Sequence, residues 1–392
     1  MKIPNIDELL TRGVEEVIDR KHLEEKLKSG KKLRLKLGID PTSPNIHIGR
    51  AVVLWKLRAF QELGHKIVLI IGDFTGLIGD TSDKESERPM LTEKQVKENL
   101  KGYLKQAGRI LDLDKTESHY NSEWLKKLRY LEIGKQADQF GLGEFIAREN
   151  IAKRMASGKR VSLREVLYPL MQGYDSVAIK ADVEFGGTDQ RFNLLAGRAL
   201  QRFYGQEPQD IITMQLLEGL DGRKMSSSWG NVINITDEPN DMYGKVMSLS
   251  DGLLTKYFVF ATRVPMAEIL DKKGNSLLAA EPYLNKKRLA REIVTLYHGA
   301  KAAAAAQTEF EKVFSEKGKP SDLPEIKVKS QNIIDLLVET KLAASKTEAR
   351  RLVQQGGVKL NDQTVREWNA LIDVEDGQVL QAGKRKFVKL RI

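Results

Sequence analysis

The chain has 392 residues, 41% of them hydrophobic, which is enough to bury one full core and leaves room for two or three. It contains no cysteine, which excludes disulfides and thiolate metal sites, and only five histidines, so we expect no protein-bound metal. Lysine and arginine total 64 against 54 acidic residues. The net charge of +10 favours polyanionic partners, but it also fits a basic, solvated surface.

Residues 1–32 are rich in charges and are predicted to form an amphipathic helix. They lack the apolar core of a signal peptide, and no apolar run in the chain reaches the length of a membrane-spanning helix. We therefore expect a soluble, cytoplasmic protein without a membrane partner.

Residues 38–50, GIDPTSPNIHIGR, lie inside a predicted strand–turn–helix–strand unit. LRLKLGI before them alternates as a strand does, AVVLWKLRAFQEL after them has helical spacing and ends at Gly64, and HKIVLIIGD is typical of a buried parallel strand. The start of such a helix favours phosphate. His47 stands at that helix start, and Gly49 leaves the backbone open to a flat group such as a purine.

The next segment, residues 72–88, is rich in glycine and aspartate and is predicted to be a loop over the carboxyl end of the sheet. Asp80 is the best-placed acid in it. A helix should then begin with a capping box from Thr92 to Gln95 and continue as KENLKGYLKQAGRIL. A short polar stretch with Asn121 and Trp124 follows, and the helical pattern over 131–159 suits packing or dimer contacts.

A second capping box, Ser162 to Glu165, opens the predicted helix LREVLYPLMQGYDSVAI. Tyr168, Gln172 and Asp175 fall at i, i+4 and i+7, so they share one face of that helix. By itself, such a polar stripe fits either a ligand site or a solvated surface.

The segment ADVEFGGTDQRFNLLAGRAL predicts a strand and a helix, with Asp189 and Gln190 at the helix entrance, and IITMQLL predicts the last strand of the sheet. Residues 219–231, GLDGRKMSSSWGN, have no apolar periodicity and are predicted to be mobile. A loop with Lys224 and three serines can close over phosphates, although an ordinary surface loop has the same composition.

The remainder is predicted to be helical over 236–315, a polar linker over 316–330, and a compact module over 331–392 with two helices and strand pairs. A Ser345 to Glu348 capping box should open the second of these helices. The module carries two basic clusters suited to phosphate contacts on folded RNA, Lys346, Arg350 and Arg351 in a helix and Lys384, Arg385 and Lys386 in a hairpin.

In its motifs the chain resembles the bacterial tyrosyl-tRNA synthetases. HIGR and KMSSS resemble the two signatures of class I aminoacyl-tRNA synthetases, usually HIGH and KMSKS. GIDPTSPNIHIG, TGLIGD, NSEW, YPLMQGYD and GGTDQRFN follow the family's order and spacing, and the last module resembles the family's small RNA-binding domain. The match covers nearly the whole chain. Each motif is weak alone, but their collinear order is not expected by chance.

The resemblance implies an α/β protein with a Rossmann-like parallel-sheet catalytic domain over 1–235 and a helical insertion at about 120–160. An all-α domain on the anticodon side over 236–315, a linker over 316–330 and a small α+β RNA-binding domain over 331–392 would follow. The implied activity is a tyrosine–tRNA ligase. It would activate L-tyrosine with ATP, accompanied by Mg²⁺, and transfer tyrosine to tRNA(Tyr), as a homodimer.

The resemblance also implies roles for individual residues. The catalytic set at the phosphates is Thr42, His47, Lys84, Arg88 and Lys224. The ATP-binding set is Asp40, Gly49, Asp189, Met225, Ser226 and Ser227. The tyrosine-binding set is Asp80, Asn121, Tyr168, Gln172, Asp175 and Gln190, with Asp175 accepting a hydrogen bond from the phenol. The tRNA would contact Lys346, Arg350, Arg351, Lys384, Arg385 and Lys386.

The sequence departs from the family pattern at three positions. Arg50 replaces the second histidine of HIGH, and Ser227 replaces the second lysine of KMSKS, so Lys224 must carry more of the charge. Lys36 replaces a tyrosine that contacts the substrate phenol in one branch of the family. A sister branch has Lys-Leu-Gly here, and Lys36 is expected to reach either the pocket or solvent.

Two alternatives from other classes remain open at this stage. The chain could be an RNA-binding protein of synthetase ancestry without activation chemistry, against which intact His47 and Lys224 argue. It could also be a tryptophanyl enzyme, against which Asp175 and the appended RNA-binding module argue.

Overall fold

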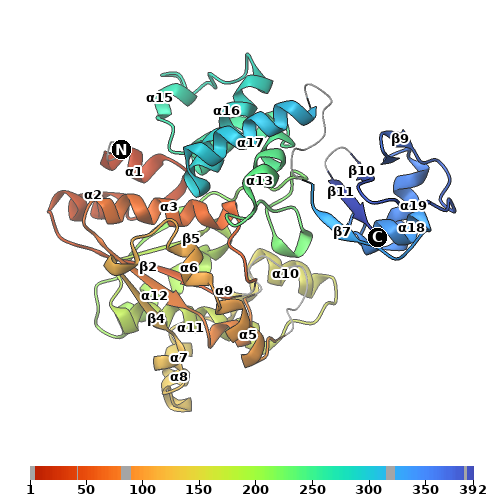
Figure 1. Ribbon diagram of the computed structural model, residues 1–392. Helices are drawn as coiled ribbons and strands as arrows, with labels where there is room; N and C mark the ends of the chain where they lie inside the picture. Colours follow the sequence, from red (N-terminus) through yellow and green to blue (C-terminus); the bar gives the residue numbers. More distant parts are fainter. Residues whose placement is uncertain (1–4, 42, 81–89, 315–322, 384–385) are drawn as a thin grey trace. The chain divides into compact units, whose positions relative to one another are not determined.

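The computed structural model describes residues 5–41, 43–80, 90–314, 323–383 and 386–392 (Figure 1). The chain forms two compact units, Met1–Ala300 and Lys301–Ile392. The first unit contains a six-stranded sheet with the strand order β1-β6-β5-β2-β3-β4. The strands are β1 Val14–Ile18, β2 Arg34–Ile39, β3 Lys66–Ile71, β4 Thr116–Tyr120, β5 Val183–Gly187 and β6 Asp210–Met214.

All neighbouring strands of this sheet are parallel except β1, which runs antiparallel to β6. The three long crossover helices are α3 Ile48–Glu62, α11 Leu163–Ile179 and α12 Arg191–Phe203. The chain moves from β2 through α3 to β3 in one direction, and through α11 and α12 to β5 and β6 in the other. Because such crossovers are right-handed, the two directions place helices on opposite faces of the sheet. The order reverses beside β2, and at such a point α/β folds bind ligands at the carboxyl ends of the strands.

The sheet is buried on both faces, as the apolar run of β3 predicts. Val68, Leu69 and Ile70 are buried although they point alternately to the two faces. On one side, Phe60 of α3 packs edge-to-face on Phe185 of β5 with ring centroids 5.4 Å apart. This contact packs the last turn of α3 against the middle of β5.

The other helices of the first unit complete these layers. α14 packs against α3 and α16, and α13 also packs against α16. Their bounds are α1 Ile6–Thr11, α2 Arg20–Lys28, α4 Thr75–Ile78, α5 Glu93–Leu100, α6 Tyr103–Ala107, α7 Ser122–Leu125, α8 Tyr130–Ala137, α9 Leu142–Ile146, α10 Glu149–Ala156, α13 Pro239–Met247, α14 Leu254–Ala261, α15 Met266–Ile269 and α16 Pro282–His298.

Helix starts agree with the capping signals in the sequence. Thr92 and Gln95 form a reciprocal capping box, Ser162 and Glu165 form a second, and the Ser345 side chain accepts from the Glu348 N–H. The end of α3 also agrees, because Gly64 follows it with φ of +88°. The helical pattern over 131–159 is confirmed as α8, α9 and α10.

The single helix predicted over 1–32 is wrong. α1 ends near Gly13, which has φ of +68°, and β1 then pairs with β6 before α2 begins. Valine and isoleucine in β1 extend the sheet at its edge, and this pairing outweighs a charge pattern typical of a helix.

Two further expectations need correction. The predicted loop 72–88 contains the short helix α4, and residues 81–89 lie outside the described part of the chain. The long helix expected after Thr92 is two helices, because Gly102 with φ of +84° separates α5 from α6. Edge strand β4, which the sequence did not reveal, follows them.

The second unit contains α17 Ala300–Phe314, α18 Ile333–Glu339 and α19 Lys346–Gln354. Its five-stranded sheet has the order β7-β11-β10-β8-β9. The strands are β7 Glu325–Lys327, β8 Val358–Leu360, β9 Gln363–Thr364, β10 Val379–Ala382 and β11 Lys386–Arg391. β7 lies within the stretch predicted as a linker and runs parallel to β11. A separate core that includes Leu336, Leu337, Val358 and Leu380 supports this unit.

Among the described residues, no helix combines the length and the apolar character needed to span a membrane.

Candidate functional site

A cleft of about 520 Å³ opens where β2, β3 and β5 end and α3 begins. It lies at the reversal of strand order. The predicted site residues that line it are Asp40, His47, Gly49, Asp80, Asn121, Tyr168, Gln172, Asp175, Asp189, Gln190, Lys224, Met225, Ser226 and Ser227. Thr42, Lys84 and Arg88 lie outside the described residues.

His47 is the N-cap residue of α3, and its Nδ1 accepts a hydrogen bond from the backbone N–H of Arg50 at 3.3 Å. Because Nδ1 accepts, the ring proton resides on Nε2. Burial, with Arg50 and Lys224 nearby, lowers the pKa of His47 to about 3. The imidazole is therefore neutral at pH 7 and offers an Nε2–H donor at a helix N-terminus.

Gly49 lies beside this imidazole, and a Cβ at its position would come within 3.2 Å of His47 Nδ1. On the other side, its backbone N–H points to Met225 Sδ at 3.4 Å. A side chain at position 49 would thus push into the surface that His47 and Met225 form at the cleft wall. This supports the expectation that the backbone here stays uncovered for a flat group.

A continuous hydrogen-bonded network runs along the floor of the cleft. The Tyr168 hydroxyl donates to Asp40 Oδ2 at 2.8 Å, and the Thr75 hydroxyl donates to Asp40 Oδ1 at 2.7 Å. Asn121 Nδ2 donates to Thr75 Oγ1 at 2.9 Å and to Asp175 Oδ2 at 3.3 Å. Asp40 and the polar stripe of α11 therefore belong to one network.

Asp175 forms the far end of this network and is only 3% exposed. Its Oδ1 accepts a hydrogen bond from Trp124 Nε1 at 2.8 Å. Burial raises the pKa of Asp175 to about 7, although Lys36, Trp124 and Asn121 all act to lower it. The carboxylate can accept more hydrogen bonds than the two donated by the Asn121 amide and the Trp124 indole. It can therefore also accept one from a hydroxyl group in the cleft.

At a second place along the cleft, Gln190 Nε2 donates to Asp80 Oδ2 at 2.7 Å, and Asn193 Nδ2 donates to Gln190 Oε1 at 3.0 Å. Since Asn193 is buried in α12, it sets the orientation of the Gln190 amide and so directs a donor at Asp80. Asp80 and Tyr168 both line the cleft, and together they form a polar wall suited to a cationic group.

Lys224 forms an ion pair with Asp189, with Nζ and Oδ2 2.9 Å apart. The surrounding loop is held by the buried Asn231, whose Oδ1 accepts from the Ser226 N–H at 2.8 Å and whose Nδ2 donates to Asp221 at 2.6 Å. The loop thus places the lysine at the carboxylate expected to bind ribose. Its predicted mobility stays a prediction.

Lys36 reaches neither the cleft nor solvent, which corrects both alternatives drawn from the sequence. Its side chain is fully buried, and Nζ lies 2.8 Å from Glu184 Oε1. It also donates to the Gln172 backbone carbonyl and to the Ser176 hydroxyl, both at 2.8 Å. Lys36 therefore supports α11 from beneath the cleft rather than contacting a ligand in it.

Two residues of the floor were not assigned a role from the sequence. Thr75, on α4, bridges Asp40 and Asn121, and Trp124, on α7, donates to Asp175. Their motifs, TGLIGD and NSEW, carry the family resemblance. Only the folded chain brings these segments within hydrogen-bonding distance of α11.

The predicted RNA-binding residues lie on the second unit. Lys346, Arg350 and Arg351 are exposed on α19, as is Lys386 at the start of β11. The Arg350 guanidinium stacks 4.0 Å from the centre of the Trp368 ring, and Lys346 pairs with Asp335 at 2.7 Å. Lys384 and Arg385 lie outside the described residues.

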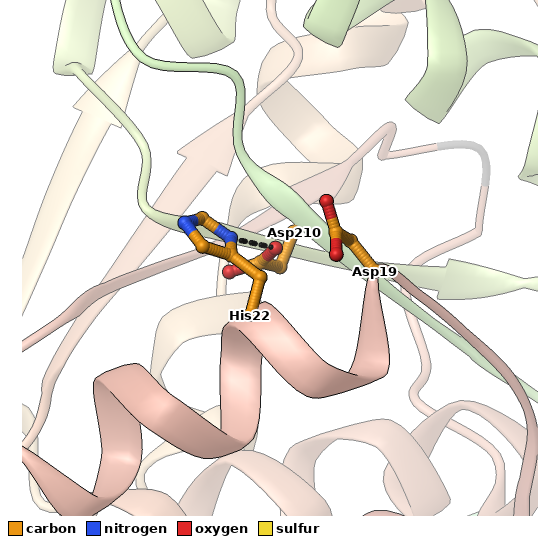
Figure 2. A group of neighbouring side chains, drawn as sticks. All are labelled: Asp19, His22 and Asp210. Carbon is orange, nitrogen blue, oxygen red and sulfur yellow. Dashed lines mark hydrogen bonds and ion pairs between the residues drawn. The ribbon is translucent and has the colours of Figure 1, made fainter.

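One group outside the cleft has metal-ligand chemistry, and Figure 2 shows its members Asp19, His22 and Asp210. His22 Nδ1 is hydrogen-bonded to Asp210 Oδ1 at 2.8 Å, which raises the pKa of His22. Lys26 Nζ lies 3.5 Å from Asp210 Oδ2 and already supplies positive charge. We therefore interpret the group as an ion-pair network that attaches α2 to β6.

Comparison with known proteins identifies two family matches. The family described as "tRNA synthetases class I (W and Y)" matches residues 28–315, and "Tyrosine--tRNA ligase SYY-like C-terminal domain" matches residues 310–390. The chain is 47% identical over 390 residues to a tyrosine–tRNA ligase of Moorella thermoacetica, covering 97% of this chain and 94% of that protein. A tyrosine–tRNA ligase of Thermotoga maritima is 45% identical, with coverages of 97% and 96%.

Solved structures with the same fold include a tyrosyl-tRNA synthetase from Archaeoglobus fulgidus complexed with L-tyrosine. Its TM-score is 0.59 at 23% identity, covering 76% of this chain and 98% of that chain. A C-terminally truncated mitochondrial tyrosyl-tRNA synthetase from Aspergillus nidulans has a TM-score of 0.65 at 21% identity, with coverages of 79% and 93%. At these identities the likeness concerns the fold.

Proposed function

The chain belongs to the class I tRNA synthetases for tryptophan and tyrosine, and from this premise we propose that it is a tyrosine–tRNA ligase. It activates L-tyrosine with ATP to tyrosyl-adenylate and pyrophosphate, and then transfers tyrosine to the 3′ end of tRNA(Tyr). The observation that favours tyrosine as the substrate is Asp175. This buried carboxylate lies at the closed end of the polar network, where it can accept a hydrogen bond from the phenol.

The tyrosine-binding part of the cleft follows from the two ends of its floor. The phenol donates to Asp175, with Asn121 and Trp124 orienting that carboxylate. The ammonium group binds near Asp80 and Tyr168, and Gln172 and Gln190 contribute polar groups between them. Asp40 holds Tyr168 in place, which links the tyrosine site to the nucleotide site.

ATP occupies the part of the cleft at the start of α3. The adenine lies against Gly49, the ribose hydroxyls bind Asp189, and the phosphates meet the helix N-terminus and the Nε2–H of His47. Met225, Ser226 and Ser227 contribute to the same wall. Mg²⁺ arrives bound to the phosphates of ATP, and we assign it no protein ligand.

The first reaction needs alignment and positive charge more than proton transfer. The tyrosine carboxylate is already ionised and attacks the α-phosphorus of ATP, while the bond between the α- and β-phosphates breaks and pyrophosphate leaves. His47 donates to phosphate oxygens that gain charge in the transition state. In the second step, a ribose hydroxyl at the tRNA 3′ end attacks the tyrosyl carbonyl, and AMP leaves.

Lys224 changes partner during activation. Its ammonium group pairs with Asp189 at 2.9 Å, and the ribose hydroxyls require the same carboxylate as an acceptor. Nucleotide binding therefore releases the ammonium group toward the phosphates, where its charge stabilises the leaving pyrophosphate. Thr42, Lys84 and Arg88 supply the remaining polar and charged contacts there.

The further parts of the proposal concern partners and location. The basic residues of α19 and β11, including Lys384 and Arg385, bind phosphates of tRNA(Tyr). The protein acts in the cytoplasm as a homodimer. The helical insertion supports a dimer contact, because Tyr130, Leu131 and Leu142 are 95%, 71% and 61% exposed.

The two alternatives have less support. A tryptophan substrate would bring an indole N–H in place of the phenol hydroxyl, and the match of residues 310–390 to a tyrosine–tRNA ligase domain favours tyrosine. An RNA-binding protein without activation chemistry has no use for the neutral His47, the Lys224–Asp189 pair and the polar floor together in one cleft.

Amino-acid-dependent exchange of pyrophosphate into ATP tests the proposal directly. We expect exchange with tyrosine and much weaker exchange with tryptophan and phenylalanine, since buried polar groups are left unpaired by an analogue that lacks the hydroxyl. Preferential exchange with tryptophan would reassign the substrate. Absence of exchange with all three, in protein that binds tRNA(Tyr), would support the RNA-binding alternative.

A further inference from the structure

A second cavity of about 370 Å³ lies in the first unit, between α1, α3, the end of β6 and the end of α14. None of its lining residues lines the first cleft. Its walls combine apolar and aromatic groups with three cationic side chains, Arg12, Lys56 and Arg263. A volume of this size is within the range of small-molecule sites, roughly 300–1,000 Å³.

Lys56 is the unusual member of this wall. It projects from the middle of α3, is 9% exposed, and donates to the Leu9 backbone carbonyl at 2.8 Å. Within the described part of the chain, no carboxylate lies within 4 Å of its ammonium group. An ammonium group has three donors, so the single carbonyl leaves hydrogen-bonding capacity on a side chain that lines the cavity.

The other charges around the cavity are already satisfied. Arg12 donates to the carbonyls of Val259 and Thr262, both at 2.8 Å, and pairs with Glu8 at 3.3 Å. Arg263 pairs with Glu62 at 3.0 Å and stacks 5.3 Å from the centre of the Trp55 ring. Lys56 is therefore the cation of this wall that has no described carboxylate within 4 Å.

This arrangement is unfavourable for folding alone, because a buried charge without an ionic partner is costly. Burial, together with the nearby Arg12 and against the opposing effect of Glu8, lowers the pKa of Lys56 to about 7. A methionine of similar length would fill the same space without that cost. A lysine at this position is explained if a negatively charged group enters the cavity and pairs with the ammonium group.

We propose that this cavity is a second ligand site, for a small organic anion whose carboxylate or phosphate binds the Lys56 ammonium group and whose apolar body packs on Trp55 and Phe260. The apolar walls include Val52, Ala59, Met214 and Pro265. An anion favours the charged lysine, so it binds more tightly below neutral pH than above it. The positive charges of Arg12 and Arg263 also favour binding of an anion, whereas the negative charge of Glu8 opposes it.

The test is calorimetric titration of the full-length protein with benzoate and with phenyl phosphate, and with benzamide as the neutral analogue of benzoate. We expect at least one anion to bind about tenfold more tightly to the parent than to Lys56→Met, which corresponds to about 1.4 kcal/mol. Binding should weaken from about pH 6 to about pH 8.5, where the amine loses its proton. Whichever anion binds more tightly identifies the headgroup.

A second measurement locates the site. Reductive methylation, read by mass spectrometry, should modify Lys56 more slowly when the anion is present, while exposed Lys21 is modified at the same rate. Equal affinity of Lys56→Met and parent for both anions would overturn the proposal, as would unchanged Lys56 methylation at saturating anion. Failure of both anions to bind the parent at millimolar concentration would also overturn it. The Lys56→Met variant should still catalyse tyrosine-dependent exchange of pyrophosphate into ATP, and this activity verifies independently that the variant folds.

Discussion

Single side chains in the cleft are held by partners from other segments, so their chemistry depends on charge states that burial sets. His47 is kept neutral by burial at a helix N-terminus, whereas Asp175 titrates near pH 7 at the end of the floor network. Lys36 lies one layer below, in a buried pair with Glu184. These three residues predict distinct responses to pH and to substitution.

Asp175 predicts a pH dependence that is specific to tyrosine. Its folded-state pKa of about 7 lies above the ordinary value of 3.8, so the carboxylate that we propose accepts a hydrogen bond from the phenol forms as pH rises through 7. kcat/KM for tyrosine in pyrophosphate exchange should therefore rise through this range and then level off. The same parameter for phenylalanine, which has no hydroxyl to donate, should not.

The variant Asp175→Asn assigns that titration. It keeps the shape of the side chain but not the charge, so the rise near pH 7 should disappear, and discrimination between tyrosine and phenylalanine should fall by upwards of ~2 kcal/mol, as for a hydrogen bond to a charged group. A variant that discriminates as the parent does would remove Asp175 from phenol recognition.

Lys36 predicts a stability effect rather than a loss of substrate contact. Lys36→Met leaves the carboxyl group of Glu184 fully buried without the lysine, which should cost about 3–5 kcal/mol of unfolding free energy. Adding Glu184→Gln removes the unpaired charge, so the double variant should recover most of that loss. Urea unfolding measures both, and a single variant as stable as the parent would contradict the assigned ion pair.

At the scale of elements, α11 organises the proposed tyrosine side of the cleft because its polar face carries Tyr168, Gln172 and Asp175 into the cleft. Its start is fixed by the Ser162 capping box. The same Glu165 that completes this box is fully buried and accepts from the Arg154 guanidinium of α10. α10 is thus attached to α11 by a buried ion pair.

This attachment predicts a large effect of one substitution. Arg154→Ala breaks the buried ion pair with Glu165 and should lower the unfolding free energy by about 3–5 kcal/mol. The neighbouring Lys153→Ala breaks an exposed pair with Glu149 and should change stability by no more than about 0.5 kcal/mol. Thermal unfolding measures the stability of both variants. Equal losses would show that the buried pair contributes no more to the unfolding free energy than the exposed pair does.

At the scale of the whole molecule, the two compact units have separate cores, and the described residues that line the cleft all belong to the first unit. The exposed basic residues of α19 belong to the second. Amino-acid activation and RNA affinity should therefore be separable by truncation.

Removing residues 323–392 should leave tyrosine-dependent pyrophosphate exchange nearly unchanged and weaken tRNA charging. The remaining RNA binding should depend less steeply on salt, by roughly 0.7–0.9 in the logarithmic slope for each phosphate that the protein no longer neutralises. The full-length variant with glutamine at Lys346, Arg350 and Arg351 should shift the slope in the same direction. Loss of exchange on truncation would mean that the second unit supports the catalytic fold.

The sequence alone determined the class of fold, the family and most of the cleft. Apolar runs, helical spacing and capping boxes are local signals, so β2, α3, β3, α11 and α12 were predictable. Tyr168, Gln172 and Asp175 shared a face by helical periodicity alone, and the collinear motifs supplied the chemistry of the other residues.

Only the tertiary structure decided the roles that depend on residues distant in the chain. β1 is a strand because β6 offers it an edge, and Lys36 is buried because Glu184 neutralises it across the sheet. The unbalanced charge of Lys56 likewise exists only when α1 and α14 close over α3. Local periodicity cannot encode these facts, because burial and ion pairing are set by whatever the fold places opposite each side chain.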